Sequence, residues 1–207
     1  AFKYTVASGN TSSDLDYKST SALALNSGTI RDAVGNNATL TLASPGASNS
    51  LGNNKALIVD TTLPTVSSVT STTANGSYNA GDAINVTVTF SEAVTLAGGN
   101  LVITLETGDT DQAVTITSVS SSTTASGTYT VQSGDGSSDL TVKTIALSAG
   151  TLSDAAGNAM SSFSIGANLA AGSAIVVDST APTVTSVTST TANGSYNVDD
   201  VIAVTIT

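Results

Sequence analysis

The chain has 207 residues with a formal net charge of −10, and only 10% of its residues are charged. That fraction lies far below the roughly 25% typical of soluble domains, so Thr, Ser, Asn and Gly must supply the solvent-facing surface. The acidic balance argues against nucleic-acid binding, and the absence of Cys and His excludes disulfides, thiolate metal sites and the commonest general base. No apolar run approaches the roughly 20 residues that span a bilayer, so we expect no membrane insertion in this segment.

Alternation with a period of two is the main local pattern. It begins with Phe2, Tyr4 and Val6 and is clearest at residues 84–90, INVTVTF, where apolar and polar side chains alternate strictly. Such alternation is typical of half-buried antiparallel strands. In chain order we predict strands near residues 65–71, 83–91, 100–107, 113–119, 127–132, 140–147 and 160–178. The last is interrupted around Gly166 to Gly172, and we interpret it as one bulged strand.

Turn signals separate these runs, among them ANGSYNAGD, LAGGN, ETGDTD, QSGDGSSD and DAAGN. No helical stripe with a period of 3.6 competes with them. About seven short strands in little more than 100 residues are what an immunoglobulin-like sandwich requires. The predicted fold class is therefore all-β, with tandem immunoglobulin-like β-sandwich domains.

An internal repeat organises the chain. Residues 62–76, TLPTVSSVTSTTANG, recur almost unchanged 118 positions later at 180–194, and YTVASGNTSSDL near the start resembles YTVQSGDGSSDL at 129–140. A unit this long is an independently cored domain rather than a solenoid repeat. We predict the C-terminal part of a first repeat at 1–61, a complete repeat at 62–179 and the N-terminal part of a third at 180–207. The chain is then a window onto a longer array.

Strand order in such a sandwich brings several polar side chains to one pole. The linker supplies Asp60, the expected loop after the second strand supplies Glu92, and the loop SDAAGN supplies Asp154 and Asn158. Calcium prefers six to eight oxygen ligands from carboxylates, carbonyls and water. We therefore predict a Ca²⁺ site where one repeat meets the next. The equivalent positions in the partial copies are Asp32, Asn36 and Asp178.

A second acidic group is expected at the opposite pole, where GDGSSD faintly resembles a calcium loop without the full 12-residue pattern. Its candidate ligands are Asp82, Asp109, Asp111, Asp135 and Asp139. In the first copy Asn10 replaces Asp135, which weakens a fixed coordination scheme.

The series VDxTxPTV, VTFSEAV, TLxDAAGN and YTVxSGD resembles the bacterial Ig-like repeats of very large surface-anchored or secreted adhesins. The resemblance implies an extracellular, cell-surface location and a role as an extender module, often stiffened by calcium. Its partners would be the neighbouring repeats of the same chain.

Three functions remain open at this point. The first is a non-catalytic extender of a long adhesin or fibre, stiffened by Ca²⁺ at domain junctions. The second is a subunit of a self-assembling filament, sheath or layer that contacts like chains, and the third is a glycan- or protein-binding module. We expect no enzymatic activity, because the carboxylates Glu106 and Asp111 lie in a loop without an aromatic sugar platform, and Ser133 with Lys143 has no supporting motif.

Overall fold

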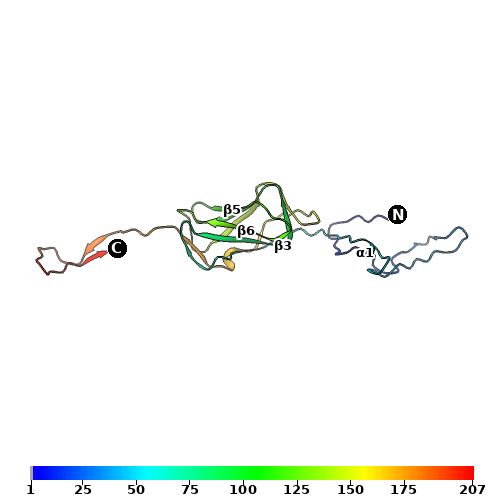
Figure 1. The fold of residues 1–207 in the computed structure, drawn as a ribbon, viewed down its shortest axis with the longest axis horizontal. Coiled ribbons are helices and arrows are strands. Elements are labelled where there is room, and N and C mark those ends of the chain that lie inside the picture. Colours follow the sequence, from blue (N-terminus) through cyan, green and yellow to red (C-terminus); the bar gives the residue numbers. More distant parts are fainter. Residues whose placement is uncertain (1) are drawn as a thin grey trace.

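The computed structural model describes residues 2–207 and is almost entirely β (Figure 1). A closed β unit occupies the middle of the molecule, and a slender segment extends from each of its two ends. The segment before it contains the short helix α1 (Leu51–Asn54), and the segment after it contains β12 (Val187–Ser189) and β13 (Val204–Ile206). The chain is thus strung out along one axis, with the closed unit between the two flanking segments (Figure 1).

The central unit contains eleven strands and one turn of 3₁₀ helix. Their bounds are β1 (Val66–Thr70), β2 (Gly76–Tyr78), β3 (Ala83–Ala97), β4 (Leu101–Glu106), β5 (Gln112–Ile116), β6 (Ser122–Thr130), β7 (Gly136–Ser137), β8 (Thr141–Leu147), β9 (Thr151–Ser153), β10 (Ile165–Ala167), η1 (Leu169–Ala171) and β11 (Ile175–Asp178). Every predicted strand position holds at least one observed strand, and the all-β prediction is confirmed.

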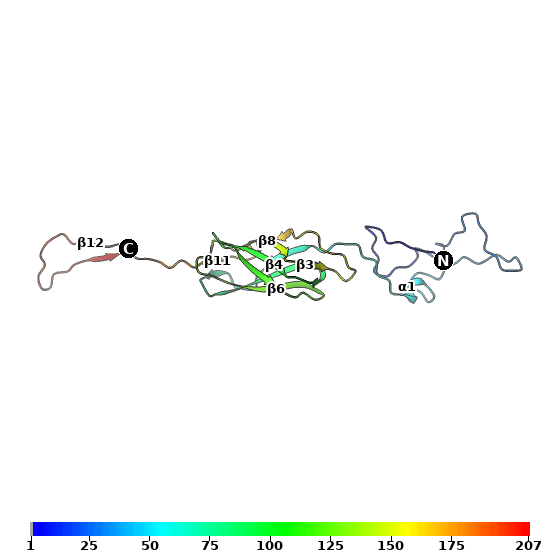
Figure 2. The ribbon, with the colours of Figure 1, turned by 90° about the horizontal axis from the view of Figure 1, so that it is seen from above.

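Two layers enclose one apolar core. One layer has the order β10-β1-β3-β6, with β9 added to the far part of β3, and the facing layer has the order β5-β4-β8. In Figure 2, β8 lies along one side of the unit and β6 along the other. A third small sheet, β2-β11-β7, closes one end. The layered arrangement is that of an immunoglobulin-like sandwich.

The alternation read from the sequence decides which side chains enter the core. In β3, Ile84, Val86 and Val88 are fully buried, while Asn85 and Thr87 between them are only partly buried. Since successive side chains of a strand point to opposite faces, one face of β3 packs into the core and the other carries hydroxyl and amide groups. These outer faces supply polar surface in a chain with few charged residues.

The prediction of one bulged strand at 160–178 is wrong. β10 pairs in parallel with β1, whereas β11 pairs with β2 and β7 in another sheet. Two local features divide the segment. Gly166 packs so closely on β1 that a Cβ would lie 2.4 Å from the Ser67 carbonyl oxygen, and Asn168 caps η1, which buries Leu169. β2 and β9, three residues each, were too short for their alternation to be recognised.

The flanking segments repeat local features of the central unit. β12 and β13 pair Val187 with Ile206, which is the register of Val69 with Val88 in the central unit moved by 118 positions. Ile206 is 67% exposed, although its counterpart Val88 is fully buried. The division into three repeats stays a prediction, and the shared register supports it.

Candidate metal centre at the repeat joint

Three carboxylates from distant parts of the sequence meet at the pole where the linker enters the central unit. Asp60, Glu92 and Asp154 each offer an oxygen, and these atoms all lie within 4.8 Å of one another. Asp154 is only 8% exposed, and the other two side chains are partly buried. The structure therefore brings together the three acids that the sequence argument assigned to this pole.

Glu92 lies within a strand, where the sequence predicted a loop. β3 continues through it, but the pairing with β6 shifts register between Thr89 and Val94, which marks a bulge. Within this bulge, the Ser91 amide donates to the Thr65 carbonyl over 2.9 Å and so keeps β3 beside the start of β1. The bulge thus holds Glu92 next to the incoming linker.

Asp154 is delivered by β9. This strand pairs with the far part of β3 through Ser153 and Thr95, so its last residue ends beside the bulge. The Asp154 carboxylate then accepts the Asn158 backbone N–H over 2.8 Å and the Asn158 side-chain N–H over 2.7 Å. Gly157 closes this loop with φ of +93°, a left-handed conformation that favours glycine.

The same loop forms in the first segment. Asp32 accepts the Asn36 backbone and side-chain N–H groups, each over 2.8 Å. Both residues are exposed there. The motif DAxGN therefore builds its own loop from local hydrogen bonds.

Asn158 has a role that the sequence argument missed. Its side-chain nitrogen also donates to the backbone carbonyl of Asp60 over 3.0 Å. The side-chain nitrogen donates to both aspartates, so Asn158 positions the linker against the loop. Asp178, the counterpart of Asp60, repeats the linker turn, because its carboxylate accepts the Thr180 N–H over 2.9 Å as Asp60 accepts that of Thr62.

The cluster contains three acidic side chains and no basic one. Burial, and then the charges of Asp154 and Asp60, raise the pKa of Glu92 above its ordinary value. Burial acts to raise the pKa of Asp154, but the hydrogen bonds from Asn158 and from the backbone of Gly157 and Ala156 together leave that pKa lowered. Within residues 2–207 the ion pairs involve only Lys143, whose partners are Glu106 and Asp111. No basic side chain of the described chain is paired with the three carboxylates.

The five acids predicted at the opposite pole do not gather in this way. Across the described residues, only the Asp60 group brings three potential ligands this close together. Asp82 caps its own turn by accepting the Asn79 N–H, and Asp109 and Asp139 are exposed. The predicted second calcium site therefore has no cluster to support it.

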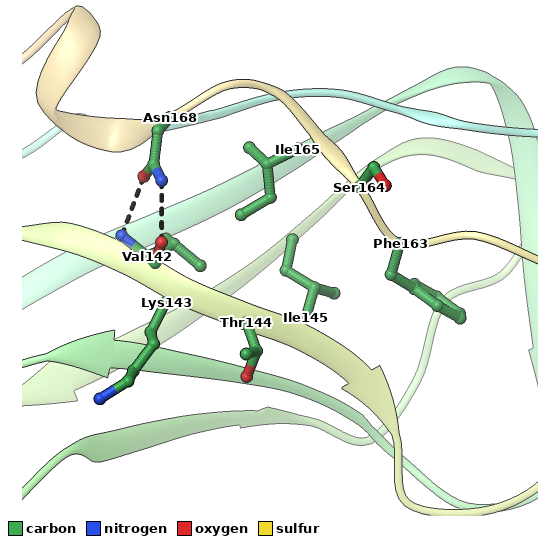
Figure 3. A pocket seen from close by; sticks show the side chains of 8 residues that line it. All are labelled: Val142, Lys143, Thr144, Ile145, Phe163, Ser164, Ile165 and Asn168. Carbon is green, nitrogen blue, oxygen red and sulfur yellow. Dashed lines mark hydrogen bonds between the residues drawn. The ribbon is translucent and has the colours of Figure 1, made fainter.

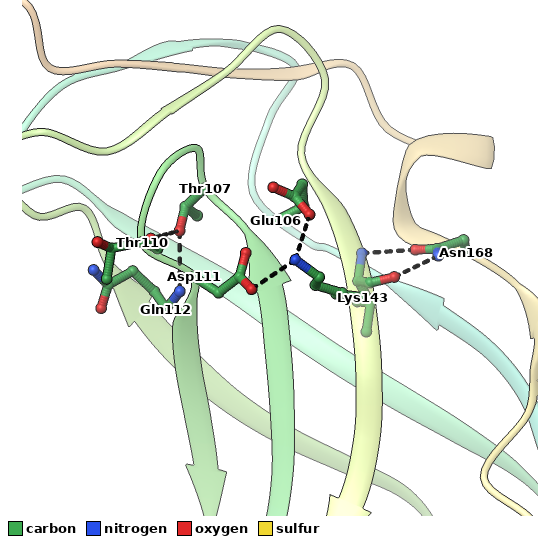
Figure 4. A network of polar contacts seen from close by, with 8 residues as sticks. Glu106, Thr107, Thr110, Asp111, Gln112, Lys143 and Asn168 are labelled. Carbon is green, nitrogen blue, oxygen red and sulfur yellow. Dashed lines mark hydrogen bonds and ion pairs between the residues drawn. The ribbon is translucent and has the colours of Figure 1, made fainter.

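Asp111 and Asp135 have other partners. Asp111 pairs with Lys143, which also contacts Glu106 (Figure 4). Asp135 is 4% exposed and accepts hydrogen bonds from the Tyr129 hydroxyl, the Gln132 backbone and the Gln112 side chain. Burial, and then the bond to Asp135, raise the pKa of Tyr129. The Asp135 carboxylate thus anchors the loop at this pole.

A hollow beside one edge of the sandwich has no catalytic constellation. A space of about 450 Å³ lies between β8 and residues 163–168 (Figure 3). Its only charged lining residue is Lys143, whose amino group points away from the hollow toward the two carboxylates of Figure 4. The Asn168 side chain bonds both the N–H and the carbonyl of Val142, which places a peptide-like group on the edge of β8.

Residues 60–165 match the family model of the bacterial Ig-like domain. The chain belongs to this family, which confirms the resemblance read from its motifs at the level of the domain. Domains of this family occur in surface proteins and are typically non-catalytic. No curated protein and no solved structure matches the chain. None of the helices in the described part of the chain is long and apolar enough to cross a membrane.

Proposed function

We propose that the chain is a non-catalytic extender from a long extracellular surface protein, in which Ca²⁺ stiffens the joint between consecutive repeats. The observation that carries this proposal is the meeting of Asp60, Glu92 and Asp154 within 4.8 Å at the pole where the linker enters. One acid belongs to the linker and two belong to the following domain. An ion held by all three would fix the linker to that domain.

The donor set fits calcium. Carboxylate oxygens are the ligands that hard cations prefer, and calcium completes its shell of six to eight oxygens with backbone carbonyls and water. The absence of His and Cys makes the set unsuited to a zinc or copper site. Asp60, Glu92 and Asp154 would hold the ion, and Asn158 would orient the first and third of them.

The mechanical consequence follows from charge. Without a cation, three clustered carboxylates repel one another and weaken the contact between the linker and the domain. A divalent cation reverses the sign of that interaction. At a free calcium concentration 100 times the dissociation constant, binding stabilises the bound form by about 2.7 kcal/mol. The neighbouring repeats of the same chain are the proposed partners, and the cell surface is the proposed location.

Calcium titration of the chain tests the proposal. We expect heat of binding in calorimetry and a higher melting temperature of the central unit with calcium than with a chelator. Asp60→Asn should remove most of both effects, because it takes the linker's carboxylate from the site. Asp109→Asn is the matched control, since that carboxylate is exposed in a loop outside the cluster. A melting temperature that does not respond to calcium in the unmodified chain contradicts the proposal.

A further inference from the structure

A hydroxyl residue follows the linker aspartate in both copies and contacts the repeat that precedes it. The Thr61 hydroxyl accepts the Gly9 N–H over 2.9 Å and donates to the Asn10 carbonyl over 3.1 Å. The Ser179 hydroxyl makes the same two contacts at the end of the central unit. It accepts the Gly134 N–H over 2.9 Å and donates to the Asp135 carbonyl over 2.7 Å. In the sequence, these hydroxyl residues follow the aspartate in VDTT and VDST.

The loop that receives the hydroxyl is built for it in both copies. Gly9 and Gly134 have φ of +84° and +95°, conformations that other residues rarely adopt. Behind them, Asn10 accepts the Tyr4 hydroxyl and the Ala7 N–H, just as Asp135 accepts the Tyr129 hydroxyl and the Gln132 N–H. The side-chain charge differs between Asn10 and Asp135, yet the geometry is the same. A contact that survives this change depends on hydrogen bonds and needs no cation.

At the first joint, the residue before the hydroxyl contacts the following repeat. The Asp60 carbonyl accepts the Asn158 side chain of the following repeat, while Thr61 is bonded to the preceding one. Two consecutive linker residues are therefore tied to two different repeats. The Thr62 N–H, bonded to the Asp60 carboxylate over 2.9 Å, fixes the turn between them.

We propose that this hydroxyl contact, which we call the linker clamp (Thr61 with Gly9 and Asn10, and Ser179 with Gly134 and Asp135), fixes the direction in which the linker leaves each repeat without any metal. The inference rests on the proposed succession of repeats but is independent of calcium. Calcium at the carboxylate cluster then adds rigidity to a linker whose direction the clamp has already fixed. The partner that the clamp positions is the next copy of this same domain.

Nuclear magnetic resonance of the ¹⁵N-labelled chain in chelator tests the clamp. We expect slow hydrogen exchange at the Gly134 amide and restricted motion at the Thr180 amide. Ser179→Ala should speed exchange at Gly134 roughly fivefold, the factor that corresponds to a hydrogen bond of about 1 kcal/mol, and should loosen Thr180. Ser179→Thr keeps a hydroxyl, as Thr61 does naturally, and should preserve both signals.

Thr180→Val is the matched control, because the Thr180 side chain is exposed and takes part in none of the described hydrogen bonds. Exchange at Val86, fully buried in β3, reports whether each variant stays folded. A Thr180 amide as mobile as the chain ends in chelator overturns the clamp, as does a Ser179→Ala variant that matches the unmodified chain.

The first joint separates the clamp from the proposed calcium site. Thr61→Val in chelator should release the Gly9 amide, whereas Thr62→Val should not. Calcium should add order at the Thr62 amide in the unmodified chain. If calcium changes nothing while the Thr61 effect persists, the calcium proposal fails and the clamp stands. If linker order appears only with calcium, the clamp fails and the calcium proposal stands.

Discussion

Replacing Glu92 by Gln is expected to have opposite effects with and without calcium. In chelator the variant should melt at a higher temperature than the unmodified chain, because it removes one of three clustered like charges. With calcium the order should reverse, because the variant lacks a ligand. A change of sign between two buffers is difficult to obtain from a general effect of the substitution on folding.

The size of the effect follows from the geometry. Two like charges 4.8 Å apart repel by about 0.9 kcal/mol in water and by about 3.5 kcal/mol at an effective dielectric constant of about 20. Glu92 and Asp60 are partly exposed, so solvent and salt screen the pair, and we take about 1 kcal/mol as the total gain. For a domain of this size that gain corresponds to about 4 °C in melting temperature.

The same substitution also has a defined pH dependence. Because the pKa of Glu92 is raised in the folded chain, the protonated form favours folding. That contribution is fully present below the ordinary pKa of 4.5 and is lost as the pH rises through the raised value. The difference in melting temperature between Glu92→Gln and the unmodified chain, in chelator, should therefore be small at about pH 4 and largest near neutral pH.

Melting curves in chelator and in calcium, each across this pH range, measure both effects. Glu106→Gln is the matched control, since the same chemical change there removes a partner of Lys143 and should stabilise in neither buffer. A Glu92→Gln variant that is less stable than the unmodified chain in chelator at neutral pH refutes the repulsion on which the reasoning depends.

Three further substitutions test neighbouring parts of the account. Asp154→Asn weakens the acceptor of its own loop, so it should destabilise the unit by about 1–2 kcal/mol in urea even without calcium, opposite in sign to the Glu92 change. Tyr129→Phe leaves the buried Asp135 carboxylate without one donor and should cost about 1–3 kcal/mol in urea, with the calcium response unchanged. Gly166→Ala brings a Cβ to 2.4 Å from the Ser67 oxygen, so hydrogen exchange should show β10 released from β1 while the β4–β8 pairing persists.

Much of the fold could be predicted because the strictly alternating segments and the recurring turn sequences between them indicate the same strand boundaries. INVTVTF places Ile84, Val86 and Val88 on one face, and the structure buries all three. The segment after Met160 could not be predicted, because its two strands are only three and four residues long and their partners lie far away in the sequence. A short strand takes its sheet from tertiary packing, here from the close approach of Gly166 to Ser67.

The candidate site could be predicted in composition but not in its fine structure. Strand order alone assigned Asp60, Glu92 and Asp154 to one pole, since antiparallel strands return to the end from which they started. The bulge that carries Glu92 has no signal in VTFSEAV, because alternation hides a register shift. The direction of the Asn158 amide depends on which acceptors surround it, and those come from a linker 98 residues away.

A crystal structure of the chain grown with calcium tests the central claim most directly. We predict one ion bound by carboxylate oxygens of Asp60, Glu92 and Asp154 at about 2.3–2.6 Å, with Asn158 still donating to the Asp60 carbonyl. A structure in saturating calcium with the three carboxylates separated, or held together by protons or water and no ion, would contradict it.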